Sequence, residues 1–128
     1  MRVLVDSSVV IDLLRQRGGA AGLLQRLVHE GTELWSSVIV RVEVRAGMRQ
    51  TEAPATEAAL TLFRWQDVTT EIADRAGSLA ARYQASHSGV DTADYIIAAT
   101  SETLGAHLLT LNVRHFPMIG GLQPAYDP

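Results

Sequence analysis

The sequence predicts an α/β fold in which a short parallel sheet is covered by helices on both faces. Short apolar, β-branched runs alternate with segments of helical periodicity along the chain. Strands separated by helices usually pair in parallel through right-handed crossovers, which leaves helices on both sides of the sheet. The length of 128 residues fits one domain and leaves no room for a second core. We therefore expect a single-domain α/β/α sandwich over residues 1–128.

The N-terminal quarter is expected to hold one strand and two helices. Residues 2–5 are rich in valine and leucine, as a buried strand requires. The polar run that follows begins a helix that extends to about Arg15. Two glycines at 18–19 then interrupt the chain, and apolar residues recur at helical spacing until Gly31.

The middle of the chain is less regular. Residues 33–37 predict a second strand and residues 38–50 a helix, although β-branched residues are only moderate helix formers. A loop is expected over 51–54, followed by a short helix over 56–63. The segment 65–68 does not favour one type of element.

The C-terminal half contains the clearest helical patterns. Apolar residues between 72 and 83 fall on one stripe and predict an amphipathic helix. After a turn at 86–90, a further helix is expected over 91–104, and residues 107–110 predict a short strand. Prolines and glycines make the remaining tail mostly loop, with room for one edge strand.

Composition excludes several classes of protein and of chemistry. The chain has no cysteine, which excludes disulfides, thiolate zinc sites and thiol nucleophiles and fits a reducing compartment. No stretch approaches the roughly 20 apolar residues of a membrane span. We therefore expect a cytoplasmic protein that does not associate with a membrane. The net charge of -3 does not indicate nucleic-acid binding by itself, so basic residues for RNA would have to be clustered. All eleven cations are arginine, which excludes mechanisms that need a lysine.

Four oxygen-bearing side chains are predicted to meet at one edge of the sheet. Asp6 ends the first strand, Glu43 lies in the helix after the second strand, Asp94 begins the helix before the last strand, and Asn112 follows that strand. Ligands in parallel sheets bind at the carboxyl ends of the strands. Clustered carboxylates repel one another unless a cation lies between them, and oxygen ligands suit Mg²⁺ or Mn²⁺.

Each acid also has a purely structural interpretation. Asp6 is well placed to cap a helix, and Glu43 could be a solvated helix residue. Asp91 and Asp94 have the spacing of a capping pair, in which both acids interact with the start of one helix. Residue patterning alone leaves the metal-site and structural interpretations open.

Two sets of arginines are candidates for phosphate contacts. Those nearest the expected site are Arg15, Arg17 and Arg114. A second set stands at i, i+4 and i+8 of one predicted helix and comprises Arg41, Arg45 and Arg49. Like charges at this spacing lower the stability of the helix, and a bound anion would offset that cost. Alternatively, the three arginines simply form a solvated basic face. The four histidines show no mutual metal-ligand spacing, and we expect them to be surface or packing residues, with substrate contact as the alternative for His115.

Four blocks of sequence resemble a known family when taken together. The opening VLVDSSVVIDLL at 3–14, SVIVRVEVRAG at 37–47, ADYIIAAT at 93–100 and LTLNVRHFP at 109–117 are similar to the motifs of VapC toxins, which are PIN-domain ribonucleases. The blocks occur in the family's order and cover nearly the whole chain. Each block is weak alone, and the combination is specific.

The resemblance implies an α/β/α PIN fold and endonucleolytic cleavage of RNA that depends on Mg²⁺ or Mn²⁺. Carried over by position, Asp6, Glu43 and Asp94 become the metal ligands. Ser8 becomes a hydroxyl that supports a ligand or contacts phosphate. Asn112 takes the place of a fourth acid, a departure that puts a fully occupied second metal site in doubt. The products would carry a 5′-phosphate and a 3′-hydroxyl.

The resemblance also implies partners, and it leaves two other functions to be weighed. A homodimer is implied, together with a VapB antitoxin from the neighbouring gene whose tail covers the acidic pocket. Asp91 either adds charge to the site or only caps its helix. One alternative is an inactive PIN-like interaction module, which Asn112 favours. The other is a receiver-like phosphoacceptor domain, which the lack of lysine and of an adjacent acidic pair disfavours.

Overall fold

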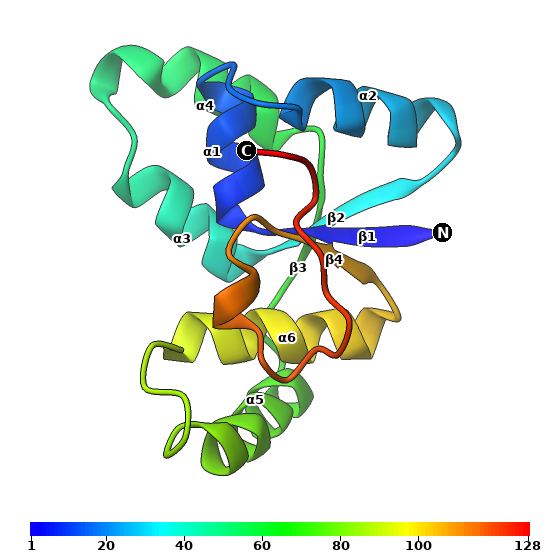
Figure 1. Cartoon of the computed structure of the whole chain (residues 1–128). Coiled ribbons are helices and arrows are strands. Elements are labelled where there is room, and N and C mark those ends of the chain that lie inside the picture. Colours follow the sequence, from blue (N-terminus) through cyan, green and yellow to red (C-terminus); the bar gives the residue numbers. More distant parts are fainter.

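The computed structural model describes residues 1–128, and its strands form one four-stranded sheet in the order β3-β2-β1-β4 (Figure 1). Every pairing is parallel, as the sequence predicts. The strands are β1 (Arg2–Val5), β2 (Glu33–Ser37), β3 (Arg64–Gln66) and β4 (His107–Leu109). The central position of β1 explains its composition, because a strand covered on both faces is apolar throughout.

Helices cover both faces of the sheet, which confirms the predicted α/β/α sandwich. Figure 1 shows α5 and α6 on one face and α1, α2 and α4 on the other, with α3 beside the carboxyl ends of the strands. The α-helices are α1 (Ser7–Leu14), α2 (Ala20–His29), α3 (Val38–Ala46), α4 (Ala53–Leu60), α5 (Thr70–Tyr83) and α6 (Thr92–Leu104). Two 3-10 turns, η1 (Gln50–Glu52) and η2 (Val113–His115), complete the chain. None of these helices combines the length and the apolar character that crossing a membrane requires.

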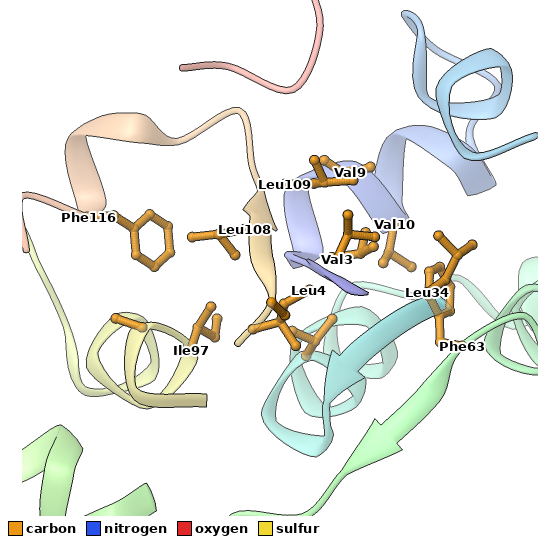
Figure 2. Packing of buried hydrophobic residues seen from close by; sticks show 14 of the residues in the cluster. Val3, Leu4, Val9, Val10, Leu34, Phe63, Ile97, Leu108, Leu109 and Phe116 are labelled. Carbon is orange, nitrogen blue, oxygen red and sulfur yellow. The ribbon is translucent and has the colours of Figure 1, made fainter. Parts of the chain in front are cut away.

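The core fills the space between the sheet and the two helical layers. Figure 2 shows Val9 and Val10 of α1 on one side of β1, and Ile97 of α6 near Leu4 on the other. Leu4 is fully buried and Val10 equally so. The buried hydrophobic residues form one connected cluster of 24. The packed core therefore fixes the strands, and with them the loops at their carboxyl ends.

The connection between β2 and β3 differs from the expected pattern. α3 ends at Ala46 rather than Gln50, and the predicted loop at 51–54 is helical instead. Pro54 lies in the first turn of α4, where no helical bond needs its missing N–H. Glu52 accepts a hydrogen bond from the backbone N–H of Arg49 at 2.8 Å, which caps η1. The proline that suggested a loop thus marks a helix start.

The C-terminal tail contains no strand beyond β4 and is held to the rest of the chain by polar contacts. The backbone N–H of Ala125 donates to the carbonyl of Thr110 at 3.0 Å, and the Tyr126 hydroxyl donates to Asp12 Oδ2 at 2.7 Å. The Tyr126 ring lies on the backbone of Gly18 and Gly19. A Cβ atom at Gly18 would come within 2.9 Å of that ring, so only glycine fits there.

Candidate metal centre

Asp6 leaves β1 at the carboxyl edge of the sheet and is 4% exposed. It precedes α1 in the capping position, yet its side chain makes no capping hydrogen bond. Its Oδ2 atom accepts instead from Thr110 Oγ1 at 2.7 Å and from Ser8 Oγ at 3.3 Å. The interpretation of this side chain as a helix cap is therefore wrong. Its carboxylate is oriented by hydroxyl groups from two different segments.

These two hydroxyls also fix the chain that follows β4. The backbone N–H of Leu111 donates to Ser8 Oγ at 3.1 Å, and that of Asn112 donates to Thr110 Oγ1 at 3.0 Å. Thr110 is completely buried. Each hydroxyl therefore links the Asp6 carboxylate to the backbone on the opposite side of the site. Ser8 thus bonds to Asp6, and its role beside a metal ligand or a phosphate stays a prediction.

Sequence reasoning assigned no role to Thr110, although strand register points to it. Val5 pairs with Leu109 in the parallel ladder, so the residues that follow them, Asp6 and Thr110, leave the sheet side by side. A small polar residue directly after a buried strand was the available signal. Its significance depends on knowing that β1 and β4 are neighbours.

Glu43 reaches the same edge from α3. The helix starts directly after β2, where Ser37 Oγ accepts from the backbone N–H of Ile39 at 3.3 Å. Val40 and Val44 are buried on the inner side of this helix and fix its rotation. Glu43 itself is half-buried, and its Oε1 atom is buried with no hydrogen-bond partner. It is not the solvated residue of the structural interpretation.

The surroundings of Glu43 disfavour its ionised form. Burial raises its pKa most, and the charges of Asp6, Asp91 and Asp94 raise it further, while a hydrogen bond from Ser7 acts in the opposite direction. A buried carboxylate oxygen without a partner is costly in free energy. A cation at this position would provide the missing partner and would reverse the effect of the neighbouring acids on the pKa.

Asp91 and Asp94 form the capping pair predicted for the start of α6. The backbone N–H of Asp94 donates to Asp91 Oδ1, and the backbone N–H of Asp91 donates to Asp94 Oδ2, both at 3.1 Å. Asp91 is exposed, whereas Asp94 is 9% exposed. The cap uses only one oxygen of Asp94 and leaves Oδ1 without a hydrogen bond. Capping and metal binding are therefore compatible at Asp94.

The pKa of Asp94 is raised to about 6. Burial is the largest cause, and the nearby charge of Asp91 adds to it, while the backbone N–H of Asp91 and the charge of His115 act in the opposite direction. His115 Nδ1 lies 3.7 Å from Asp94 Oδ2. Burial and neighbouring charge together shift the pKa of the two acids Glu43 and Asp94 upward.

Asp6, Glu43 and Asp94 thus form one electrostatic cluster at the carboxyl edge. As it stands, no group of three or more acidic or histidine side chains has an arrangement that could hold a metal ion. Mg²⁺ keeps several of its waters and would need fewer protein ligands. The all-oxygen donor set and the unpartnered Glu43 Oε1 both fit a hard divalent cation.

Asn112 lies beside this cluster without making a side-chain contact. The residue is exposed, and its only bonds to the site run through its backbone. Its N–H contacts Thr110, and its carbonyl accepts from the N–H of His115 at 2.9 Å. The side chain takes no part in the hydrogen bonds that hold Asp6.

The structure separates the candidate phosphate-binding arginines. Arg15 forms an ion pair with Glu52 at 3.9 Å, and Arg17 is exposed on the turn after α1. Arg114 lies in η2, next to His115, whose Nδ1 atom is 3.7 Å from Asp94 Oδ2.

Only Arg41 and Arg45 of the predicted arginine stripe lie on α3, because the helix ends at Ala46, before Arg49. Arg45 pairs with Glu57 at 2.6 Å, and the Arg41 guanidinium lies 4.7 Å from the centre of the Trp65 ring. A carboxylate and an aromatic face therefore offset the charges of these two residues. Arg41 and Arg45 therefore do not require an external anion.

Comparison with known proteins identifies relatives over almost the whole chain. The PIN domain family matches residues 3–121. Ribonuclease VapC19 of Mycobacterium tuberculosis is 47% identical over 123 residues, which cover 96% of this chain and 98% of the relative. Ribonuclease VapC10 of the same organism is 40% identical over 124 residues, which cover 97% of this chain and 92% of the relative.

Solved structures lead to the same family. A toxin–antitoxin complex from Klebsiella pneumoniae contains a chain that is 28% identical and superposes with a TM-score of 0.80. The match covers 98% of this chain and 99% of that one. Sequence identity, coverage and fold therefore agree. The chain belongs to the PIN-domain family and, within it, to the VapC ribonucleases.

Proposed function

We propose that this chain is a metal-dependent endoribonuclease and the toxin of a VapBC toxin–antitoxin pair. The observation that carries the proposal is the buried, unpartnered Oε1 of Glu43, surrounded by the charges of Asp6, Asp91 and Asp94. Family membership supports the substrate class, since the relatives VapC19 and VapC10 are ribonucleases. The substrate is RNA, which we expect the protein to meet in the cytoplasm.

Asp6, Glu43 and Asp94 would hold the metal, and Mg²⁺ or Mn²⁺ fits their oxygen donors. When bound, such an ion supplies a water of lowered pKa and neutralises charge that develops on phosphoryl oxygens. Thr110 and Ser8 hold the Asp6 carboxylate in place through hydrogen bonds of 2.7 and 3.3 Å. The backbone N–H of Asp91 does the same for Asp94. No side chain of the protein needs to act as nucleophile.

The direct test is metal-dependent cleavage of RNA by the purified protein. We expect no cleavage in EDTA and recovery on addition of Mg²⁺ or Mn²⁺, with 5′-phosphate ends on the fragments. Cleavage that persists in EDTA would contradict metal dependence. Complete inactivity of folded protein with either metal would favour the alternative, an inactive interaction module. Family membership already argues against a receiver-like domain.

The proposed partner is a VapB antitoxin encoded by the neighbouring gene. Without metal, the carboxylates of Asp6, Glu43 and Asp94 concentrate negative charge, and an arginine from a partner could form bidentate hydrogen bonds with them. Mg²⁺ would compete for the same oxygens. Expression of this chain alone should slow bacterial growth, and the neighbouring gene should restore it. Raising Mg²⁺ at constant ionic strength should weaken the purified complex.

We further propose that the free toxin is a homodimer, as the family resemblance implies. Light scattering coupled to gel filtration would measure the mass directly. A mass equal to that of one chain at micromolar concentration would exclude the dimer and would leave the nuclease proposal unaffected.

A further inference from the structure

A hollow of about 340 Å³ lies between the turn that precedes α6 and the 3-10 turn η2. Its volume falls in the range of about 300–1,000 Å³ that small-molecule sites occupy. Four of its five lining residues are not hydrophobic. The lining residues are His87, Gly89, Val90, Arg114 and His115. A hollow of this size suits one nucleotide.

The wall formed by the turn is held in place by local hydrogen bonds. His87 Nδ1 lies 2.8 Å from Ser86 Oγ, and the imidazole packs 5.8 Å from the Tyr83 ring. The His87 N–H donates to the Tyr83 carbonyl at 2.9 Å, and its own carbonyl accepts from the N–H of Val90 at 3.3 Å. The imidazole therefore occupies a defined position without a ligand.

The opposite wall is anchored by the core. Phe116, which directly follows η2, is 1% exposed and packs near Leu108 (Figure 2). Arg114 in η2 is exposed and forms no ion pair, whereas six other arginines of the chain do. Its guanidinium is therefore free to bind an anion on a fixed segment of backbone.

The hollow adjoins the carboxylate cluster at two points. His115 lines it and has Nδ1 at 3.7 Å from Asp94 Oδ2. Val90 lines it and directly precedes Asp91, which caps the helix that carries Asp94. A polymer bound across the carboxylates would continue into the hollow without a break.

We propose that this hollow binds one unpaired nucleotide of the RNA, next to the scissile phosphate. Arg114 contacts the phosphate of that nucleotide, and the His87 imidazole stacks on its base. Imidazole and guanidinium groups are common platforms for unstacked bases and their phosphates in RNA recognition. The inference rests on the proposed ribonuclease function and assigns to these residues a role in binding rather than in the chemical step.

The test measures RNA binding in EDTA, where the proposed nuclease cannot cleave. Fluorescence anisotropy with a short, mixed-sequence single-stranded RNA would be recorded over a series of salt concentrations. Loss of one phosphate contact in Arg114→Gln should reduce the slope of log K against log salt by about 0.7. His87→Ala should weaken binding by about tenfold at a pH where the imidazole is neutral, with the slope unchanged.

A steric variant probes the same hollow without removing a polar group. A Cβ atom at Gly89 would have no neighbour within 4 Å, and its φ angle does not require glycine, so Gly89→Leu adds bulk without strain. We expect it to weaken RNA binding at least as much as His87→Ala. Gly22→Leu on α2, where the Cβ position is equally open, is the matched control. Arg26→Gln, also on α2, is the charge control, and neither should change RNA binding.

Several outcomes would overturn the inference. Wild-type affinity and salt slope in the Arg114, His87 and Gly89 variants would exclude a nucleotide subsite, while Mg²⁺-dependent cleavage by the same proteins would leave the nuclease proposal standing. Normal RNA binding combined with weaker binding of the neighbouring gene's product would assign the hollow to a protein partner instead. Absence of both cleavage and RNA binding in wild-type protein would defeat the proposed function together with the inference.

Discussion

Two glutamates near opposite ends of β2 lie in opposite electrostatic environments. Glu33, at the start of the strand, accepts hydrogen bonds from Trp35 at 3.0 Å and Arg2 at 3.2 Å, and lies 3.3 Å from Arg64. The Trp35 hydrogen bond and the two arginines lower its pKa. Glu43, in the helix that follows the strand, has its pKa raised by burial and by neighbouring acids.

The difference separates a carboxylate whose partners the chain supplies from one that it leaves partly unpartnered. Around Glu33 the chain supplies the partners that an ionised carboxylate needs. Around Glu43 it supplies three more acids and leaves one buried oxygen unpartnered. A buried acceptor without a partner costs about 1–3 kcal/mol. The metal proposed for this site would supply the partner that the chain itself does not.

The largest expected effect is on RNA cleavage. Asp94→Asn and Glu43→Gln each remove a ligand charge and should reduce the rate more than about 100-fold, since even residues that only support a metal ligand typically contribute 10- to 100-fold. Glu33→Gln is the matched control at the other end of β2 and should cleave at the wild-type rate. Initial rates at saturating Mg²⁺ would be compared after circular dichroism has verified each fold. Full activity of Asp94→Asn at low Mg²⁺ would refute the assignment.

The second effect concerns the hydroxyl that orients Asp6. Thr110→Val keeps the volume but removes the 2.7 Å hydrogen bond to Asp6 Oδ2. We expect cleavage to fall about 10- to 100-fold, and unfolding by urea to show a loss of about 1–3 kcal/mol because a buried carboxylate loses a donor. Thr100→Val on α6 removes a buried hydroxyl that bonds only to the Ile96 carbonyl and serves as control. An activity loss of equal size in both variants would argue against a specific role for Thr110.

Much of the fold follows from local patterns. β1, β2, α5 and α6 were predicted to within a few residues, because the apolar pattern of each extends over the whole element. The elements in segment 51–66 were not predicted correctly, because a helix that starts with a proline and a strand of three residues have little recognisable pattern in the sequence. β3 exists because β2 offers it a free edge, a tertiary cause that is not encoded in residues 64–66.

The site shows the same division between local and tertiary information. The acids Asp6, Glu43 and Asp94 stand in motifs that can be found in the sequence. The role of Thr110 depends on the pairing of β1 with β4, which no local pattern contains. Likewise, the sequence offered capping as an alternative for both aspartates. Only the orientation of each side chain separates Asp6, which makes no cap, from Asp94, which does.

The third effect is a pH dependence of stability in the metal-free protein. The folded-state pKa of Asp94, about 6, lies above its value of about 4 in an unfolded chain, so the folded state binds more protons between these limits. Stability from this group is present below pH 4 and is lost as the pH rises through 6. Between pH 4 and pH 7, the free energy of unfolding of Asp94→Asn should therefore rise by about 1–3 kcal/mol relative to that of the wild type.

Urea unfolding in EDTA over this pH range measures that gain directly. The difference between the two proteins reports Asp94 together with its effect on the pKa of Glu43, while groups such as Glu33 with a lowered pKa contribute the opposite slope equally to both. Added Mg²⁺ should restore stability to wild type above pH 6 and have little effect on the variant. Parallel stability curves for the two proteins would show that the Asp94 carboxylate is not destabilised by its surroundings.

The smallest expected effect comes from adding a further acid beside Asp6, Glu43 and Asp94. Asn112 is exposed beside the cluster, and its backbone N–H is fixed by Thr110 at 3.0 Å. In Asn112→Asp, the new charge should tighten Mn²⁺ binding by about fivefold, which corresponds to about 1 kcal/mol of attraction through solvent. Gln25→Glu adds the same charge on α2 and should leave the affinity unchanged. Calorimetry gives both affinity and stoichiometry, so a second ion would be detected as well. If Asn112→Asp and Gln25→Glu bind Mn²⁺ equally, residue 112 does not face the metal, and three carboxylates together with water complete its coordination.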